Sequence, residues 1–331
     1  MACKGSLKET SDKNLQNGYS KAHLKSMYGT TKPVTIKGTS ESFTDMVIDH
    51  TVGTSISGVQ RKMFMILEQG ILVPSNQGEY IVKPTPKGLL QLSENEHAIM
   101  KIAERVGFHV AKCSVAPFED GELAYVTRRF DLTDNKKVKI FVEDGASICD
   151  VHPMHKGNDA LSYENAIKKM VTACGGAIAH SVYAVKHVLF SYLVGNNGLH
   201  LKNFALKRAP TSKSNLMDGF APLYDLLSTA PYPDYDQEYL SLSLLQTETE
   251  GDFSASYEAY GYYTKHDFML LLEFLGVKPS IGEKIILELV ANVSKISLQV
   301  LHLSSLRDEM QSTMMTRITN RCAAIERKII A

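Results

Sequence analysis

Asn203 and Asp225 are the two side chains of this sequence best placed to do chemistry, because each follows or interrupts an apolar run. Asn203 ends the segment 192–203, YLVGNNGLHLKN, and Asp225 lies within 221–229, APLYDLLST. Amide and carboxylate oxygens bind the metal ions that bridge nucleotide phosphates during phosphoryl transfer. In that chemistry an acidic residue five positions before the asparagine accepts the hydroxyl proton of the acceptor. Gly198 occupies this position, so the sequence predicts the metal ligands without the expected general base.

Lys83 is the candidate for contacting the phosphates. It ends the segment 79–84, EYIVKP, whose other side chains are mostly apolar, so its ammonium group can point into a cleft. A surface lysine at the end of a strand is at least as common. Glu96, or Glu94 two residues earlier, is the expected partner on a following helix. Ser93 and Glu96 also have the spacing of a capping box, which is a second use for the same glutamate.

Two further segments carry weaker signals. The segment 54–62, TSISGVQRK, could lay the backbone N–H groups around Ser57 and Gly58 on phosphates, but it has one glycine and an ordinary hairpin loop is the commoner interpretation. His200 could act as a base or a ligand. Because no second histidine lies nearby at metal-site spacing, a histidine that supports the loop by hydrogen bonds is favoured.

Composition places limits on the kind of protein. The chain has 331 residues and 44% hydrophobic residues, enough for two lobes with a sizeable core. A net charge of +0 gives no reason to expect a nucleic-acid partner. Five widely spaced cysteines with no CxxC pair favour a reducing compartment. The N-terminus is polar and no apolar run approaches the ~20 residues of a membrane span, so we expect a cytoplasmic protein without membrane contact.

The pattern of elements changes along the chain. Residues 1–40 are polar with little periodicity and are expected to form a flexible extension. Residues 41–130 predict strands and one helix, which ends at Gly107, whereas 131–331 predict amphipathic helices interrupted at Gly175 and Gly176. The sequence therefore predicts an α+β fold with two lobes, in the manner of a protein kinase.

Six segments occur in a fixed order along the chain: SISGVQRK, EYIVKP, ENEHAIMKIAERVG, TRRFD, GNNGLHLKNFAL and APLYDLLST. In that order they resemble the signature segments of HipA-like serine/threonine kinases, the toxins of HipA/HipB-type toxin–antitoxin modules. The resemblance runs from about Ser55 to the end of the helical lobe. Because the chain has no room for the small N-terminal domain of the longer members, it resembles the short HipT-type toxins most closely.

The resemblance implies roles for individual residues. Asn203 and Asp225 match the family's metal ligands for Mg²⁺, and Ser55 and Ser57 match loop serines that autophosphorylate. The implied ATP-binding residues are Ser57, Gly58, Lys83, Arg129, Phe130, Lys202, Asn203 and Asp225. The implied catalytic segment contains Gly198, His200 and Lys202. The family pattern GNxDxHxKN has its catalytic Asp where this chain has Gly198, which is either an engineered inactivation or a natural pseudokinase.

Members of this family phosphorylate aminoacyl-tRNA synthetases and themselves, and so inhibit translation. The resemblance thus implies ATP and Mg²⁺ as cofactors, a HipB-like DNA-binding antitoxin and a small HipS-like protein as partners, and a synthetase as substrate. A chain without the base could instead be a non-catalytic module that binds a nucleotide or a partner. A lipid or sugar kinase on a similar fold is a third, more distant alternative.

Overall fold

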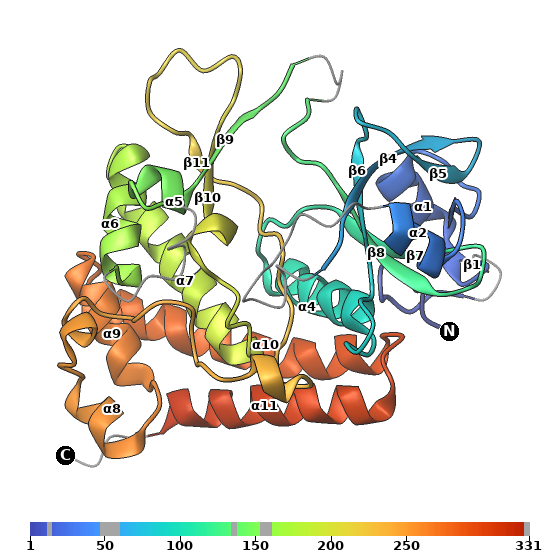
Figure 1. Ribbon diagram of the computed structural model, residues 1–331. Helices are drawn as coiled ribbons and strands as arrows, with labels where there is room; N and C mark the ends of the chain where they lie inside the picture. Colours follow the sequence, from blue (N-terminus) through green and yellow to red (C-terminus); the bar gives the residue numbers. More distant parts are fainter. Residues whose placement is uncertain (12–14, 47–59, 134–137, 153–160, 328–331) are drawn as a thin grey trace.

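The computed structural model describes the chain except for residues 12–14, 47–59, 134–137, 153–160 and 328–331 (Figure 1). One part is a six-stranded sheet with the order β3-β5-β4-β6-β8-β7, antiparallel apart from the β3–β5 pair. Its strands are β3 (Thr35–Ile36), β4 (Met63–Glu68), β5 (Ile71–Pro74), β6 (Tyr80–Pro84), β7 (Cys113–Pro117) and β8 (Leu123–Arg128). The expected strands are present, and β5 is an additional strand just before the expected turn.

The two faces of this sheet pack against different partners. Side chains alternate between faces along a strand. Val82 of β6 belongs to a core shared with helices α1 (Lys21–Tyr28) and α2 (Ser40–Met46), whereas the next residue, Lys83, points to the face covered by α4 (Leu92–Val106). This alternation is what directs Lys83 toward the interior of the molecule.

The start of α4 differs from the expected capping box. Gln91 is the N-cap, with a left-handed backbone (φ 52°) and no side-chain capping bond. The Ser93 hydroxyl donates instead to the carbonyl of Lys83 at 3.0 Å, and the Glu96 carboxylate contacts the Lys83 ammonium group. The capping prediction was wrong because β6 supplies stronger partners for both side chains. The helix ends at Gly107 as predicted, since this glycine adopts a left-handed C-cap.

The described part of residues 1–40 is packed and structured, contrary to the expected flexible extension. The hairpin β1 (Leu15–Gln16) and β2 (Tyr19–Ser20) precedes α1, and β3 joins the large sheet. Leu7 is fully buried in the core beside α4, where the Arg105 guanidinium group donates to its carbonyl. The segment is anchored by a few buried apolar side chains spread too sparsely to give a periodic pattern.

The second part is helical and begins beyond the sheet. Its helices are α5 (Gly145–Ile148), α6 (Tyr163–Ala173), α7 (Ile178–Val194), α8 (Ala255–Tyr260), α9 (Lys265–Phe274), α10 (Pro279–His302) and α11 (Asp308–Glu326). A small sheet of β9 (Phe141–Asp144), β10 (Ala205–Arg208) and β11 (Gly219–Phe220) lies beside them. As predicted, Gly175 and Gly176 separate two helices; both have positive φ angles.

Helix α10 connects the two parts of the fold. It packs against α4 of the β-rich part and against α7, α9 and α11 of the helical part, and Figure 1 shows it running with α11 beneath both. In length and composition α10 could also cross a membrane, contrary to the expectation that no segment reaches that length, and 39% of its most apolar window is buried inside the protein.

Candidate functional site

The loop between α7 and β10 is shaped by its own backbone and side-chain bonds. Helix α7 ends at Gly195, whose φ of 72° is left-handed. The Asn196 side-chain oxygen then accepts from the backbone N–H of Gly198 at 3.2 Å, which turns the chain. Leu199 and Leu201 are buried on either side of His200 and fix the loop to the core. The 3₁₀ turn η3 (Leu201–Asn203) follows and directs the buried asparagine side chain toward Asp225.

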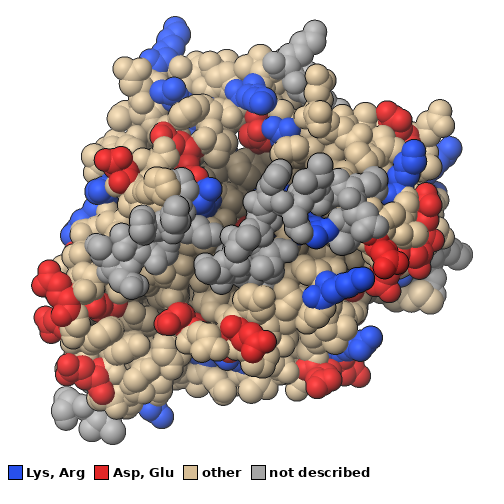
Figure 2. All heavy atoms as spheres, viewed as in Figure 1, with Lys and Arg blue, Asp and Glu red and all other residues tan. Residues whose placement is uncertain are grey.

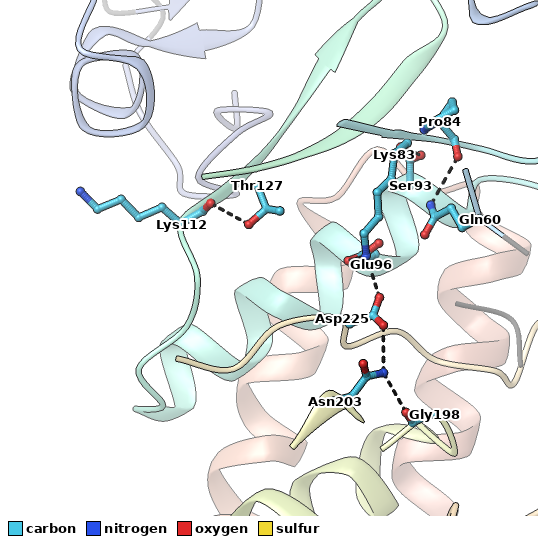
Figure 3. Close-up of polar contacts among 10 residues, drawn as sticks. All are labelled: Gln60, Lys83, Pro84, Ser93, Glu96, Lys112, Thr127, Gly198, Asn203 and Asp225. Carbon is cyan, nitrogen blue, oxygen red and sulfur yellow. Dashed lines mark hydrogen bonds and ion pairs between the residues drawn. The ribbon is translucent and has the colours of Figure 1, made fainter. Parts of the chain in front are cut away.

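Four side chains from four separate parts of the chain meet at this loop, as Figure 3 shows. The Lys83 ammonium group lies 2.8 Å from a Glu96 oxygen and 2.6 Å from Asp225 Oδ1. Of the two glutamates considered as its partner, Glu96 makes the contact. The amide of Asn203 donates to Asp225 Oδ2 at 2.8 Å. Strand β6, helix α4 and the loop therefore converge on Asp225.

The charges in this group are strongly coupled. Burial alone would lower the pKa of Lys83, but the carboxylates of Asp225 and Glu96 outweigh it and raise the pKa above its ordinary value. Burial would raise the pKa of Asp225, yet Lys83 above all lowers it to about 2. Burial dominates at Glu96, which is 0% exposed, and raises its pKa to about 7 against the opposing effect of Lys83. One ammonium group thus neutralises Asp225 more fully than Glu96.

The donor atoms of Asn203 and Asp225 suit a hard divalent cation. Both protons of the Asn203 amide nitrogen are used, one by Asp225 and one by the carbonyl of Gly198 at 3.0 Å. No hydrogen bond to Asn203 Oδ1 is present within the described ranges, so this oxygen can act as a metal ligand beside the carboxylate of Asp225. One carboxylate with one amide oxygen is the sparse protein donor set that Mg²⁺ combines with phosphate oxygens and water. The residues therefore fit the metal.

Gly198 lies beside this group with its backbone used and no side chain. Its carbonyl accepts from Asn203 and from the backbone N–H of His200 at 2.8 Å. Among the described residues, a Cβ placed on Gly198 would meet only the Asn196 side-chain oxygen, at 3.2 Å, and the φ of Gly198 is not in the left-handed region. The backbone can therefore accommodate a larger residue after a small shift of one amide.

The remaining loop candidates differ in exposure. His200 is buried, and its charge is among the smaller effects that lower the pKa of Asp225. Lys202 is exposed at the mouth of the site, and its carbonyl accepts from the Tyr224 hydroxyl at 2.7 Å. The structure thus brings His200 close to the charged group and leaves the Lys202 side chain facing solvent.

The segment TRRFD crosses from β8 toward the helical part. Arg129 donates to Asp131 through two nitrogens, at 3.0 and 2.6 Å, so its guanidinium group is fixed by a neighbouring carboxylate. The ring of Phe130 lies 5.5 Å from that of Tyr224, the residue before Asp225. Phe130 is therefore close to the charged group through one aromatic contact, whereas Arg129 is engaged elsewhere.

Ser55, Ser57 and Gly58 lie outside the described residues, so their predicted contacts with phosphates stay predictions. Lys62, at the end of the same segment, is exposed, and its charge is among the smaller effects that lower the pKa of Asp225.

Two supporting residues were not found from the sequence. Asn95 of α4 accepts from the Ser228 N–H at 2.9 Å and donates to the Ser228 carbonyl at 2.8 Å, and so ties the segment after Asp225 to the helix. The Tyr125 ring of β8 lies 5.5 Å from the Lys83 ammonium group. Their only sequence signal was a polar residue on a buried helix face and an aromatic residue on a buried strand, which is too common to be specific.

Figure 2 shows a hollow between the β-rich and helical parts, with Lys and Arg interspersed among Asp and Glu on the same face. One buried ammonium group, two carboxylates and an amide, arranged as around Asp225, can hold a metal–phosphate group. For general-base chemistry, a carboxylate at the position of Gly198 would be needed in addition.

Comparisons with known proteins agree with this arrangement. The family model described as the HipA-like C-terminal domain matches residues 54–296. A protein named "Putative kinase" from Haemophilus influenzae is 33% identical over 259 residues, covering 74% of each chain. "Putative kinase Y4dM" from Sinorhizobium fredii is 31% identical over 202 residues, or 54% of this chain and 46% of that one.

Among solved structures, the chain is similar to a Shewanella oneidensis MR-1 structure described as a toxin–antitoxin complex of HipA, HipB and its operator DNA. The TM-score is 0.65 at 18% identity, with 87% of this chain and 71% of the other covered. At this identity the likeness concerns the fold, and it confirms the predicted α+β, two-lobed fold class.

Proposed function

The chain belongs to the HipA-like kinase family, and we propose that it binds Mg·ATP between its two lobes as a serine/threonine protein kinase whose chemical step is impaired at Gly198. The observation that carries the proposal is the meeting of Lys83, Asp225 and Asn203. In kinases, a lysine, a carboxylate and an amide together hold the nucleotide phosphates and their metal.

The residues have separate tasks in this proposal. Asp225 and the Asn203 side-chain oxygen would hold Mg²⁺, which neutralises charge on the transferring phosphate when bound. Lys83 would exchange its contact with Asp225 for phosphate oxygens, while Glu96 keeps its ammonium group aimed at the cleft. Phe130 would border the adenine, and the loop with Ser57 and Gly58 would cover the phosphates. Lys202 and His200 would lie near them.

Gly198 limits the chemical step of the proposed kinase. A glycine supplies no oxygen to orient the acceptor hydroxyl or to take its proton, and the amides of Asn196 and Asn197 are too weakly basic to replace a carboxylate. Binding of the nucleotide does not require that base. We therefore expect cofactor binding to persist while phosphoryl transfer is strongly reduced.

The family also suggests partners and regulation. The solved relative is in complex with HipB and DNA, which supports a HipB-like antitoxin as a partner here. An aminoacyl-tRNA synthetase is the proposed substrate, a HipS-like protein a further partner, and the cytoplasm the proposed location. Phosphate on Ser55 or Ser57 would add about −1.5 to −2 charges to the proposed phosphate loop and repel the nucleotide.

A pseudokinase that only binds a nucleotide or a partner is the second candidate, and the absence of a side chain at Gly198 favours it. The two candidates share the cofactor site and differ in whether a restored base restores chemistry.

Titration calorimetry with ATP in the presence of Mg²⁺ tests the proposal. We expect saturable binding to the unmodified chain and loss of its Mg²⁺ dependence in Asp225→Asn, because one of two protein metal ligands loses its charge. The matched control is Asp252→Asn, an exposed aspartate in the helical part, which should bind like the unmodified chain. Equal Mg²⁺-dependent affinity in Asp225→Asn would contradict the assignment.

A further inference from the structure

A second cavity lies on the helical part, between α11 and the segment that follows the turn η4 (Pro233–Tyr235). Its volume is about 650 Å³, and basic and aromatic side chains line much of it. Its lining includes Tyr192, Tyr239, Tyr262, Arg317, Arg321 and Arg327. None of them belongs to the charged group around Asp225.

Arg321 is the unusual residue of this cavity. It is 5% exposed, and its guanidinium carbon lies 4.4 Å from the ring centre of Tyr192 and 4.8 Å from that of Tyr239. Nη1 donates to the carbonyl of Tyr192 at 3.0 Å and weakly to that of Tyr239 at 3.5 Å. Within the described part of the chain, Nε and Nη2 make no hydrogen bond, and no carboxylate lies within ion-pair distance of Arg321.

A buried guanidinium group without a carboxylate is unfavourable. It carries five N–H donors and keeps its charge, so taking it out of water without an anion costs several kcal/mol. Burial lowers the pKa of Arg321, and the charge of Arg317 adds to this effect, although Tyr192, Tyr239 and the carboxylate of Asp236 oppose it. An anion in the cavity would supply the missing charge and acceptors.

The nearby acid Asp236 is already engaged. It forms a two-pronged ion pair with Arg317, with the Nη1–Oδ1 distance at 2.9 Å, and also accepts from the Thr229 hydroxyl at 2.9 Å. The other acid of the cavity, Glu238, is exposed to solvent. Among the described lining residues the three arginines exceed the two acids in charge, and the ion pair belongs to Arg317, so Arg321 and Arg327 have none there.

Arg327 adds a third guanidinium group at the rim. It is exposed, and its carbon lies 5.0 Å from the ring centre of Tyr260 and 5.8 Å from that of Tyr262. Planar guanidinium groups held by aromatic rings are pre-organised for tetrahedral oxyanions, to which they donate two hydrogen bonds each.

We propose that this cavity is a binding site for a phosphate monoester, with Arg321 as the central contact and Arg327 at the entrance. Clusters of arginines are the usual means of recognising phosphate groups, and a dianion would offset the excess of positive charge. The volume exceeds that of one phosphate group, so the ligand carries further atoms. Those atoms belong either to a phosphorylated peptide or to a small free phosphate ester.

Two probes test the site and distinguish the sources: a peptide containing one phosphoserine, and O-phosphoserine alone, titrated calorimetrically at constant ionic strength. We expect saturable binding of at least one probe and about 10- to 100-fold weaker binding by Arg321→Met, from the loss of charged hydrogen bonds. Tighter binding of the peptide identifies a peptide site, and equal binding identifies a small-ligand site. No saturable binding of either probe overturns the proposal.

Controls separate this site from the nucleotide cleft and from loss of folding. Arg307→Met removes an exposed arginine outside the cavity and should bind the probes like the unmodified chain. Lys83→Met should also leave probe binding unchanged, because Lys83 belongs to the other site. Because Arg321 is buried, Arg327→Gln provides a test at an exposed position, with binding several-fold weaker and an unchanged melting temperature. Probe binding unaffected by either cavity variant contradicts the proposal.

Discussion

The two ends of the loop 198–203 differ in the polar side chains that surround them. At the end near Asn203, an amide, two carboxylates and an ammonium group lie within 3 Å of their neighbours. At the other end, Gly198 contributes only backbone groups, both of them hydrogen-bonded. Lys83 and Glu96 are held by β6 and α4, and Asn203 contacts Gly198 only through its backbone carbonyl. We therefore expect the groups proposed for cofactor binding to keep their positions when the side chain at position 198 changes.

Introducing an acid at position 198 should have the largest effect on phosphoryl transfer. In Gly198→Asp we expect phosphoryl transfer to rise by about 10²- to 10⁴-fold, since this is the usual contribution of a general base. The measurement is transfer of labelled phosphate from ATP to the protein itself or to a synthetase.

The matched control is Gly198→Asn, which has almost the same size and meets the same Asn196 contact but lacks a basic carboxylate. It should remain as slow as the unmodified chain. If Gly198→Asp also stays slow while still binding ATP, other parts of the site have been lost and the pseudokinase alternative is favoured.

Removing the ammonium group of Lys83, which contacts Asp225 near Asn203, should weaken cofactor binding. Lys83→Met is expected to lower the affinity for Mg·ATP by about 10- to 100-fold, because charged hydrogen bonds to phosphate are lost. Calorimetry gives the affinity, and Lys25→Met, which removes an exposed lysine on α1, serves as the control. Equal affinities in the two variants would place the phosphates away from Lys83.

The pH dependence of stability tests the charge of Glu96, the second carboxylate that contacts Lys83. The pKa of Glu96 rises from 4.5 to about 7 on folding, so between these values the folded chain binds more protons than the unfolded chain. Its contribution to stability is therefore present below pH 4.5 and is lost as the pH rises through 7. Relative to Glu96→Gln, the unmodified chain should lose roughly 1–3 kcal/mol of unfolding free energy over this range.

Urea unfolding at several pH values between 4.5 and 8 measures this difference. A difference between the two proteins that does not change with pH would mean that Glu96 stays ionised throughout, held by Lys83. Asp225 should not contribute in this window, because its pKa is lowered to about 2.

Much of this fold follows from local patterns, and what was missed depends on distant contacts. Gly107 and the pair Gly175–Gly176 ended helices as predicted, because their backbone preferences act locally. The expected capping box at Ser93 failed because its side chain is used by a strand ten residues earlier. Residues 1–40 looked unstructured because their buried side chains pack on elements far along the chain.

The candidate site shows the same division. Lys83, Asn203 and Asp225 could be proposed from their positions beside apolar runs. Asn95 could not, because its partner Ser228 is 133 residues away and nothing in either local sequence indicates the contact.

We propose that the unmodified chain keeps a working metal–nucleotide site although the base position is a glycine. Its most direct test is the equilibrium affinity of this chain for ATP, measured with saturating Mg²⁺ and again with the metal removed by a chelator. We expect saturable binding with Mg²⁺, at least about tenfold weaker binding without it, and the same affinity in Gly198→Asp within about threefold. No binding, or binding indifferent to Mg²⁺, would contradict it.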